Sequence, residues 1–519
     1  MNVSTRAALC IFSLCLCIGL IGGCNPLPSL ENRSQTIALP EAEAESTRLG
    51  NGISPQAEQH PGKSGIYSLS NARDAFAARA LLAQAAERTL DIQYYIWRND
   101  LTGTLLFEAL HAAADRGVRV RLLLDDNNTS GLDTTLAALD AHPNIEVRLF
   151  NPFTIRKPRW IGYVTDFSRA NRRMHNKSFT ADNQATIIGG RNVGDEYFGA
   201  TDGVLFADLD VLAVGPVVNE VSNDFDRYWA SDSSYPVTTV LPYVDSAELK
   251  KLATEASLVE RNPAAAAYIA ALHNSALIHG LMNGTLQFEW ATARLVSDDP
   301  GKGLALASPD KLLTHELSQI IGNPESELDL VSPYFVPGAA GVDAFAAMAQ
   351  KGVQIKILTN SLDATDVAAV HAGYAKRRKP LLKAGIHLYE MRRLSPESEK
   401  NKNTGPFGSS GSSLHAKTFS VDRSRVFVGS FNFDPRSAKL NTELGLVIES
   451  PALAMQIAAA FDKKIRAAAY EVRLSDTGRL YWLEQVNGKS VRHDTEPGTS
   501  FWQRAGVKLL SLLPIEWLL

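Results

Sequence analysis

Residues 175–192 read HNKSFTADNQATIIGGRN, and residues 415–432 read HAKTFSVDRSRVFVGSFN. Both stretches follow one spacing, H-x-K-x4-D-x6-G-[GS]-x-N, from His175 to Asn192 and from His415 to Asn432. At average residue usage, six near-fixed positions match by chance at roughly 10⁻⁷ to 10⁻⁸ per starting point. A second copy at the same spacing is therefore no accident, and it indicates an internal repeat whose site needs two of each residue.

The predicted secondary structure repeats around the two copies. In each part of the chain, helices alternate with strands, and the motif forms a hairpin. The first part has helices over 75–88 and 104–116 and strands over 90–97, 118–124 and 145–150; the second has helices over 311–321 and 344–351 and strands over 328–331, 353–358 and 386–389. This order predicts an α/β fold made of two pseudo-symmetric halves, each a mixed sheet flanked by helices, with the active site at their interface.

Composition and repeat together divide the chain into six expected segments. They are a signal peptide over 1–23, a flexible tether over 24–62, a first half over 63–235, a helical linker over 236–286, a second half over 287–470 and a C-terminal extension over 471–519. The extension is apolar near its end and contains Trp502 and Trp517. It is expected either to dock on the domain or to lie in a membrane interface.

The N-terminus is typical of a secretory signal. Arg6 is the only charged residue before position 31, an apolar run covers 7–20, and Cys24 follows two glycines. This arrangement resembles the lipobox of bacterial lipoproteins, which implies lipidation of Cys24 and a place at the periplasmic face of the bacterial envelope, with the outer membrane favoured. An uncleaved anchor or an ordinary signal peptide is the alternative. All four cysteines lie at or before position 24, so no disulfide framework is expected.

The overall charge argues against a polyanionic partner. The formal net charge is −4, so no nucleic-acid partner is expected. Basic residues do cluster beside both motifs, over 156–173 and 376–393. They form either a solvated face or a surface that attracts anionic lipid headgroups. The oligomeric state is left open.

The residue types of the doubled motif suit phosphodiester chemistry. The His and Lys of each copy alternate along an expected strand and so point to one face, and the Asn returns an amide to that face. Lys and Asn hold the non-bridging oxygens, one imidazole attacks phosphorus, and the other serves as acid and base. No metal or cofactor is needed, although the His and Asp residues leave a metal site as the alternative. The candidate catalytic residues are His175, Lys177, Asn192, His415, Lys417 and Asn432.

The doubled motif resembles that of the phospholipase D superfamily, over residues 65–470. The resemblance implies one shared site with His175 as nucleophile and His415 as acid, although pseudo-symmetry allows the reverse. It implies that Asp182 and Asp422 support loops. It also implies a carboxylate hydrogen-bonded to each imidazole, for which the candidates are Glu443, Asp208 and Asp210.

A closer resemblance is carried by residues 166–177 and 189–198 and by Pro-Ile-Glu at 514–516. These stretches resemble bacterial cardiolipin synthases of the C type. That implies phosphatidyl transfer between phospholipids at a membrane surface, with phosphatidylglycerol and phosphatidylethanolamine as substrates. The transfer would pass through a phosphohistidine. A phospholipase D that hydrolyses phospholipids to phosphatidic acid is the alternative, and a nuclease is a further one.

Overall fold

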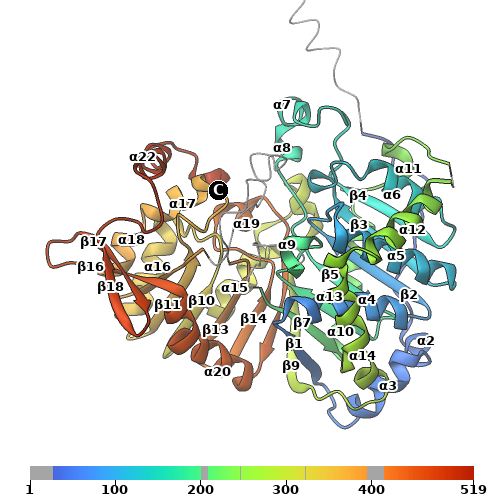
Figure 1. Ribbon diagram of the computed structural model, residues 1–519, viewed down its shortest axis with the longest axis horizontal. Helices are drawn as coiled ribbons and strands as arrows, with labels where there is room; N and C mark the ends of the chain where they lie inside the picture. The colour runs from blue at the N-terminus through green and yellow to red at the C-terminus, as the bar shows by residue number, and fades with distance from the viewer. Residues whose placement is uncertain (1–26, 200–207, 246, 322, 394–413) are drawn as a thin grey trace, which may run out of the picture.

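The computed structural model describes residues 27–199, 208–245, 247–321, 323–393 and 414–519. The expected signal peptide and Cys24 lie outside these residues. Within the described chain, no helix is both long and apolar enough to span a bilayer. Figure 1 shows two halves side by side, each with a central sheet and helices packed on it.

The first half is built on a mixed eight-stranded sheet. Three neighbouring strands, β2, β3 and β4, are parallel, and the other pairings are antiparallel. The order is β1 (Ser64–Leu69), β7 (Asp210–Val214), β6 (Ala185–Gly189), β5 (Ser178–Ala181), β2 (Thr89–Tyr94), β3 (Arg119–Asp125), β4 (Ile145–Phe150) and β8 (Ser234–Pro236).

The second half repeats this order, with β10, β11 and β12 parallel. Its strands run β9 (Glu289–Ser297), β15 (Leu444–Glu449), β14 (Arg425–Gly429), β13 (Thr418–Val421), β10 (Glu327–Val331), β11 (Gln354–Asn360), β12 (His387–Met391) and β16 (Ala469–Leu474). Strand β1 pairs antiparallel with β9, so the two sheets are continuous across a pseudo-twofold axis. Apolar side chains from both halves, among them Ile188, Val428 and Leu446, form a shared core at this junction.

Helices cover the sheets and begin at capping side chains. Asn71 accepts main-chain N–H groups at the start of α4, and Asp100 does so for α5. The first half contains α4 (Ala72–Ala85), α5 (Leu101–Asp115), α6 (Asp133–Asp140), α7 (Ile161–Thr165), α8 (Phe167–Ala170), α9 (Asp195–Phe198) and α10 (Pro216–Trp229). The second contains α15 (Leu313–Ile321), α16 (Gly338–Gln350), α17 (Ala368–Ala375), α18 (Arg378–Lys383), α19 (Pro435–Lys439), α20 (Pro451–Ala459) and α21 (Arg466–Ala468).

The two motif hairpins, β5–β6 and β13–β14, turn at residues with left-handed backbone. Asp182 and Asp422 both have φ of 50°, and each is followed by a residue with φ of 51°, as the two central residues of a type I′ turn require. The carboxylate of Asp182 accepts main-chain N–H groups at 87–89, and that of Asp422 accepts those at 325–327. Each aspartate thus ties its hairpin to the strand beside it.

The described part of the expected flexible tether is ordered on the first half. It contains α2 (Glu41–Glu45) and α3 (Arg48–Ala57), and Leu49 joins the hydrophobic core. The guanidinium groups of Arg121 and Arg148, both buried, donate to the main-chain carbonyls of Thr36 and Ser34. The structure differs from the expectation because buried arginines of the sheet satisfy their donors on this segment.

The segments expected as linker and extension also pack on the halves. Helices α11 (Val237–Val240), α12 (Ala247–Glu260), α13 (Ala266–Asn274) and α14 (Ala276–Met282) lie against α3–α6. The expected extension begins inside a strand, because β16 pairs with β12 in the second sheet. Strands β17 (Leu480–Val486) and β18 (Lys489–His493) continue this sheet, and α22 (Phe501–Leu510) follows.

Candidate active site

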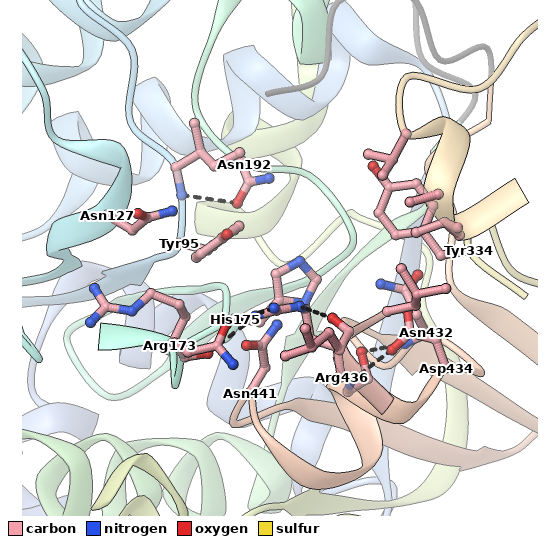
Figure 2. A pocket seen from close by; sticks show the side chains of 18 of the residues that line it. Tyr95, Asn127, Arg173, His175, Asn192, Tyr334, Asn432, Asp434, Arg436 and Asn441 are labelled. Carbon is pink, nitrogen blue, oxygen red and sulfur yellow. Dashed lines mark hydrogen bonds between the residues drawn. The ribbon is translucent and has the colours of Figure 1, made fainter. Parts of the chain in front are cut away.

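A cavity lies where the two halves meet. Both motif histidines, His175 and His415, and both motif asparagines, Asn192 and Asn432, line it. Figure 2 shows His175, Asn192 and Asn432 converging on this cavity from different elements. The candidate residues of both sequence copies therefore come together at the junction, as the repeat predicted.

The segment that carries His175 and Lys177 precedes β5 and does not belong to it, contrary to the expected strand. It is held instead by the other half. The main-chain N–H of His175 donates to the carbonyl of Thr442 at 2.9 Å. The main-chain N–H of Thr442 donates to the carbonyl of Arg173 at the same distance. This short bridge fixes the segment with His175 in the first half to the loop that leads into β15 of the second.

Each imidazole is hydrogen-bonded to a carboxylate of the opposite half. His175 Nδ1 lies 2.7 Å from Glu443 Oε2, and His415 Nδ1 lies 2.7 Å from Asp208 Oδ2. Of the two first-half candidates, Asp208 is the one at an imidazole. Asp210 instead pairs with the buried guanidinium of Arg79 at 2.8 Å and lies near Arg191. The carboxylates thus cross between the halves.

The motif glycines make room for these carboxylates. A Cβ atom at Gly190 would lie 2.2 Å from Asp208 Oδ1, and one at Gly189 would lie 2.1 Å from Asp210 Oδ1. The second copy has Ser430 in place of Gly190, and its hydroxyl donates to Glu443. The glycines were expected to let the backbone approach whatever occupies the site; in the structure, supporting side chains fill that space.

Both motif lysines lie buried beside the cavity, and each donates to the main-chain carbonyl of its own motif histidine. Burial and the charge of Lys417 hold the pKa of Lys177 well below its usual range. Burial lowers the pKa of Lys417 to about 8. Two cations so close together are costly without an anion, so the pair is suited to bind one.

The imidazoles are neutral near pH 7. Burial and the two lysines hold the pKa of His175 well below its usual range. Burial and Lys417 lower the pKa of His415 to about 3. Because Nδ1 carries the proton that each carboxylate accepts, Nε2 carries the lone pair. This is the tautomer that a nucleophile or a base requires.

The two carboxylates differ in how readily they ionise. Burial raises the pKa of Glu443 to about 7, although hydroxyl donors, Ser437 among them, stabilise its charged form. Burial also opposes ionisation of Asp208, but His415 and Lys417 bring its pKa down to about 2. Asp208 is therefore fully ionised, and His415 is the imidazole whose protonated form has the stronger counter-charge.

The motif asparagines present polar atoms that the protein does not satisfy. Asn192 Oδ1 accepts from the N–H of Ile96 at 3.2 Å, while its Nδ2 is buried and has no hydrogen-bond partner within the described residues. Asn432 Oδ1 is likewise buried and has no hydrogen-bond partner within the described residues. Buried unpaired amide atoms in a cavity are suited to a polar ligand.

Several residues of this cavity lie outside the doubled motif. Tyr95 packs edge-on against His175 at a centroid distance of 4.9 Å, and Tyr197 packs likewise against His415 at 5.1 Å. Arg436 of α19 lines the cavity and donates to Asn171 Oδ1 at 2.7 Å. Aromatic residues at strand ends were a usable signal for Tyr95, whereas nothing in the local sequence singled out Arg436.

The basic clusters beside the motifs are largely engaged in internal ion pairs. Arg156 and Arg159 both pair with Asp133. Arg377 pairs with Glu516 at 2.9 Å, and Arg378 pairs with Glu390 at 2.8 Å. These guanidinium groups stabilise the fold around the cavity and do not form an open cationic surface. Among the described residues, no group of three or more His, Cys, Asp and Glu side chains is placed to hold a metal ion.

Fold and site together define a two-lobed phospholipase D-like protein. The structure of a phosphatidylserine synthase from Haemophilus influenzae superposes with a TM-score of 0.57 over 90% of this chain and 99% of that one, at 13% identity. The family described as "Cardiolipin synthase, PLD-like domain" matches residues 79–229 and 317–465, one match in each half. The chain belongs to this family.

Two relatives extend over nearly the whole chain. Cardiolipin synthase C of Escherichia coli K12 is 52% identical over 472 residues, which are 91% of this chain and all of that protein. An uncharacterised protein of Helicobacter pylori is 32% identical over 475 residues, 90% of this chain and 92% of that one.

Proposed function

We propose that this protein is a cardiolipin synthase-like phosphatidyltransferase that joins two phospholipids through a phosphohistidine. The observation that carries the proposal is the pair of crossed histidine–carboxylate hydrogen bonds, His175–Glu443 and His415–Asp208, at one cavity. Two oriented imidazoles on one phosphodiester allow two successive displacements. The 52% identity to a protein named cardiolipin synthase C supports the lipid assignment.

In the first step, Nε2 of His175 attacks the phosphorus of the donor lipid. The bond from phosphorus to the headgroup oxygen breaks, and protonated His415 gives its Nε2 proton to the leaving alkoxide. His415 becomes protonated when the anionic phosphodiester binds, because a nearby negative charge raises the pKa of an imidazole. Phosphatidyl-His175 and a free headgroup alcohol result.

In the second step, the acceptor is a free hydroxyl of the phosphatidylglycerol headgroup. His415, now neutral, removes the proton of this hydroxyl as its oxygen attacks phosphorus, and the phosphorus–nitrogen bond to His175 breaks. The products are cardiolipin and the regenerated imidazole. Phosphatidylglycerol or phosphatidylethanolamine serves as the phosphatidyl donor.

We assign the roles of the two histidines from the difference between their carboxylates. Asp208 is ionised and stabilises the imidazolium of His415, which suits the acid. Glu443 has a raised pKa and so gives His175 a weaker counter-charge, which favours the neutral nucleophile. Lys177, Lys417, Asn192 and Asn432 hold the non-bridging oxygens as charge develops on them.

The protein is proposed to act at the periplasmic face of a bacterial envelope, with the outer membrane favoured, anchored through acylated Cys24. The lipobox-like sequence before Cys24 supports this placement. Growth with a radiolabelled fatty acid tests it. The wild type incorporates label and Cys24→Ala does not; label in both would reject the anchor.

The activity is tested by incubating the purified protein with phosphatidylglycerol, with and without phosphatidylethanolamine, and separating the lipids. Cardiolipin is the expected product. Phosphatidic acid alone would replace the transferase with a hydrolase, and release of oligonucleotides from added DNA would indicate a nuclease. His175→Ala abolishes the product, whereas the matched change His387→Ala, at an exposed histidine of β12, leaves it intact.

A further inference from the structure

The C-terminal segment exposes large apolar side chains. Trp502 and Leu509 of α22 are 80% and 65% exposed, and Leu512, just after the helix, is 76% exposed. The opposite side of α22 is docked, because Val507 packs with Leu362 and Ala372. The helix is therefore held on the second half with an apolar side turned to solvent.

A second apolar projection stands on the first half. Trp160, at the start of α7, and Val164 within it are 64% and 68% exposed, and Phe167 at the start of α8 is 44% exposed. These side chains lie within eight positions of one another in the sequence. Large exposed apolar clusters on soluble surfaces mark interaction sites.

Both projections belong to the rim of the active-site cavity. Tyr163 of α7 lines the cavity from the first half, and Leu518 and Leu519 line it from the second. In Figure 1, α7 and α22 rise at the same end of the molecule, one on each half, with the C-terminus and α19 between them. The two apolar clusters thus flank one opening.

The C-terminal projection is firmly attached. Glu516 pairs with Arg377 at 2.9 Å and with Lys376 at 3.2 Å. Leu519 packs with Val336 and Val370, and its carbonyl accepts from the N–H of Arg436 at 2.7 Å. The segment over 514–519, which includes the Pro-Ile-Glu stretch, therefore sets the position of the exposed side chains relative to the cavity.

We propose that these two clusters are a membrane-docking rim that inserts into the surface of a phospholipid bilayer and presents the cavity to lipid headgroups. The inference rests on the proposed function and deepens it by naming the surface through which the substrate is reached. An exposed tryptophan on each projection suits the headgroup layer. Lys508 on α22 and Lys157 beside Trp160 are exposed cations that complement anionic lipids.

A bilayer fits this rim better than a protein partner does. A protein seated on both projections would cover the opening between them, whereas a bilayer supplies the substrate there. The described chain also starts at this end of the molecule: Ser29 lies beside Thr238 and Thr239 of α11, which is at the same end in Figure 1. An acylated Cys24 and the rim could then engage one membrane.

The rim is tested by site-specific labelling of the full chain reconstituted with vesicles of phosphatidylethanolamine and phosphatidylglycerol. All native cysteines lie at or before position 24, and with these four replaced by serine, one introduced cysteine carries a polarity-sensitive fluorophore. Trp502→Cys and Val164→Cys report an apolar environment when vesicles are present. Met455→Cys, on α20 at the opposite end, is the control and does not change. Unchanged emission at both rim positions would overturn the inference.

A kinetic test distinguishes a loss of membrane docking from a loss of catalysis. The double variants Trp502→Ser/Leu512→Ser and Trp160→Ser/Val164→Ser are expected to lower turnover of vesicle lipids at least about tenfold. They keep wild-type turnover of short-chain lipids dissolved as monomers. The control Leu258→Ser/Met455→Ser, at similarly exposed sites, changes neither. Equal vesicle turnover in rim and control variants refutes the rim. If the wild type forms no lipid product from either substrate but the fluorophores still report an apolar environment, the proposed function is refuted and the membrane-docking rim is not.

Discussion

Each motif imidazole of this protein is hydrogen-bonded to a side chain in the other half of the chain. His175 depends on Glu443, 268 positions away, and His415 depends on Asp208, 207 positions away. A carboxylate at Nδ1 fixes the tautomer and supports the imidazolium that forms during proton transfer. The difference between the two carboxylates is the basis for assigning different roles to two otherwise equivalent histidines.

These roles predict different behaviour toward an activated donor. His175→Ala and His415→Ala are both expected to lower turnover of natural lipids by at least about 10³-fold. With a phosphatidyl ester of a weakly basic phenol, whose departure needs no acid, His415→Ala still forms the phosphoenzyme and His175→Ala does not. The measurement uses a donor lipid with radioactive phosphorus and quantifies the label that stays covalently bound to the protein. The opposite pattern would make His415 the nucleophile.

Substitutions of the neighbouring acids Asp208 and Asp210 are expected to have different effects, the first on activity and the second on stability. Asp208→Asn weakens the support of the His415 imidazolium and is expected to lower turnover by about 10²- to 10⁴-fold, with little effect on unfolding. Asp210→Asn leaves the guanidinium of Arg79 buried without its counter-charge. It is expected to reduce the free energy of unfolding by about 3–5 kcal/mol. Urea denaturation and lipid turnover measure the two effects; equal losses in both variants would contradict the division.

The motif was sufficient to predict which six residues meet at the junction, because its spacing encodes one hairpin in each half. It was insufficient to choose between Asp208 and Asp210, because alternation along a strand does not say which side chain meets a cavity and which meets a buried arginine. The crossing of the carboxylates depends on the Thr442 bridge, a contact between distant segments that has no local signature.

Among the elements, strand and helix positions were close to those predicted wherever hydrophobic periodicity was strong, as for β4 and β11. The ends of the chain were harder. Residues 27–62 look polar and aperiodic, yet they receive hydrogen bonds from Arg121 and Arg148. Most of strand β16 was placed in an unpaired extension because its partner, β12, lies 78 to 84 positions earlier in sequence.

The C-terminal elements are attached through a buried ionic cluster that predicts a pH dependence. Burial opposes ionisation of Glu496, but Arg378 and His371 lower its pKa from 4.5 to about 2. Its contribution to stability is therefore complete above pH 4.5 and is lost as the pH falls toward 2.

Glu496→Gln is accordingly expected to lower the free energy of unfolding by about 2–3 kcal/mol at pH 7. The difference from wild type shrinks below pH 4.5. Thermal unfolding across pH 3–7 measures it, with the exposed Glu255→Gln as a control that shifts little. A difference that stays constant with pH would exclude the ionic explanation.

At the scale of the whole molecule, the continuous sheet and the shared core make the two halves one folding unit. Leu446 of β15 is fully buried in the core that both halves form. Leu446→Ala is expected to cost about 2–5 kcal/mol of stability and to lower a single unfolding transition. Calorimetry distinguishes this from two transitions, of which only one would move if the halves unfolded independently.

The crossed hydrogen bonds also determine when each motif histidine gains its orienting carboxylate during synthesis of the chain. As the chain emerges, the first motif is complete long before Glu443 has been made, because Glu443 lies 268 positions after His175. Until both halves have folded against each other, His175 lacks the carboxylate that sets its tautomer. A nascent or truncated chain that lacks Glu443 thus carries an intact first motif whose histidine has no orienting carboxylate.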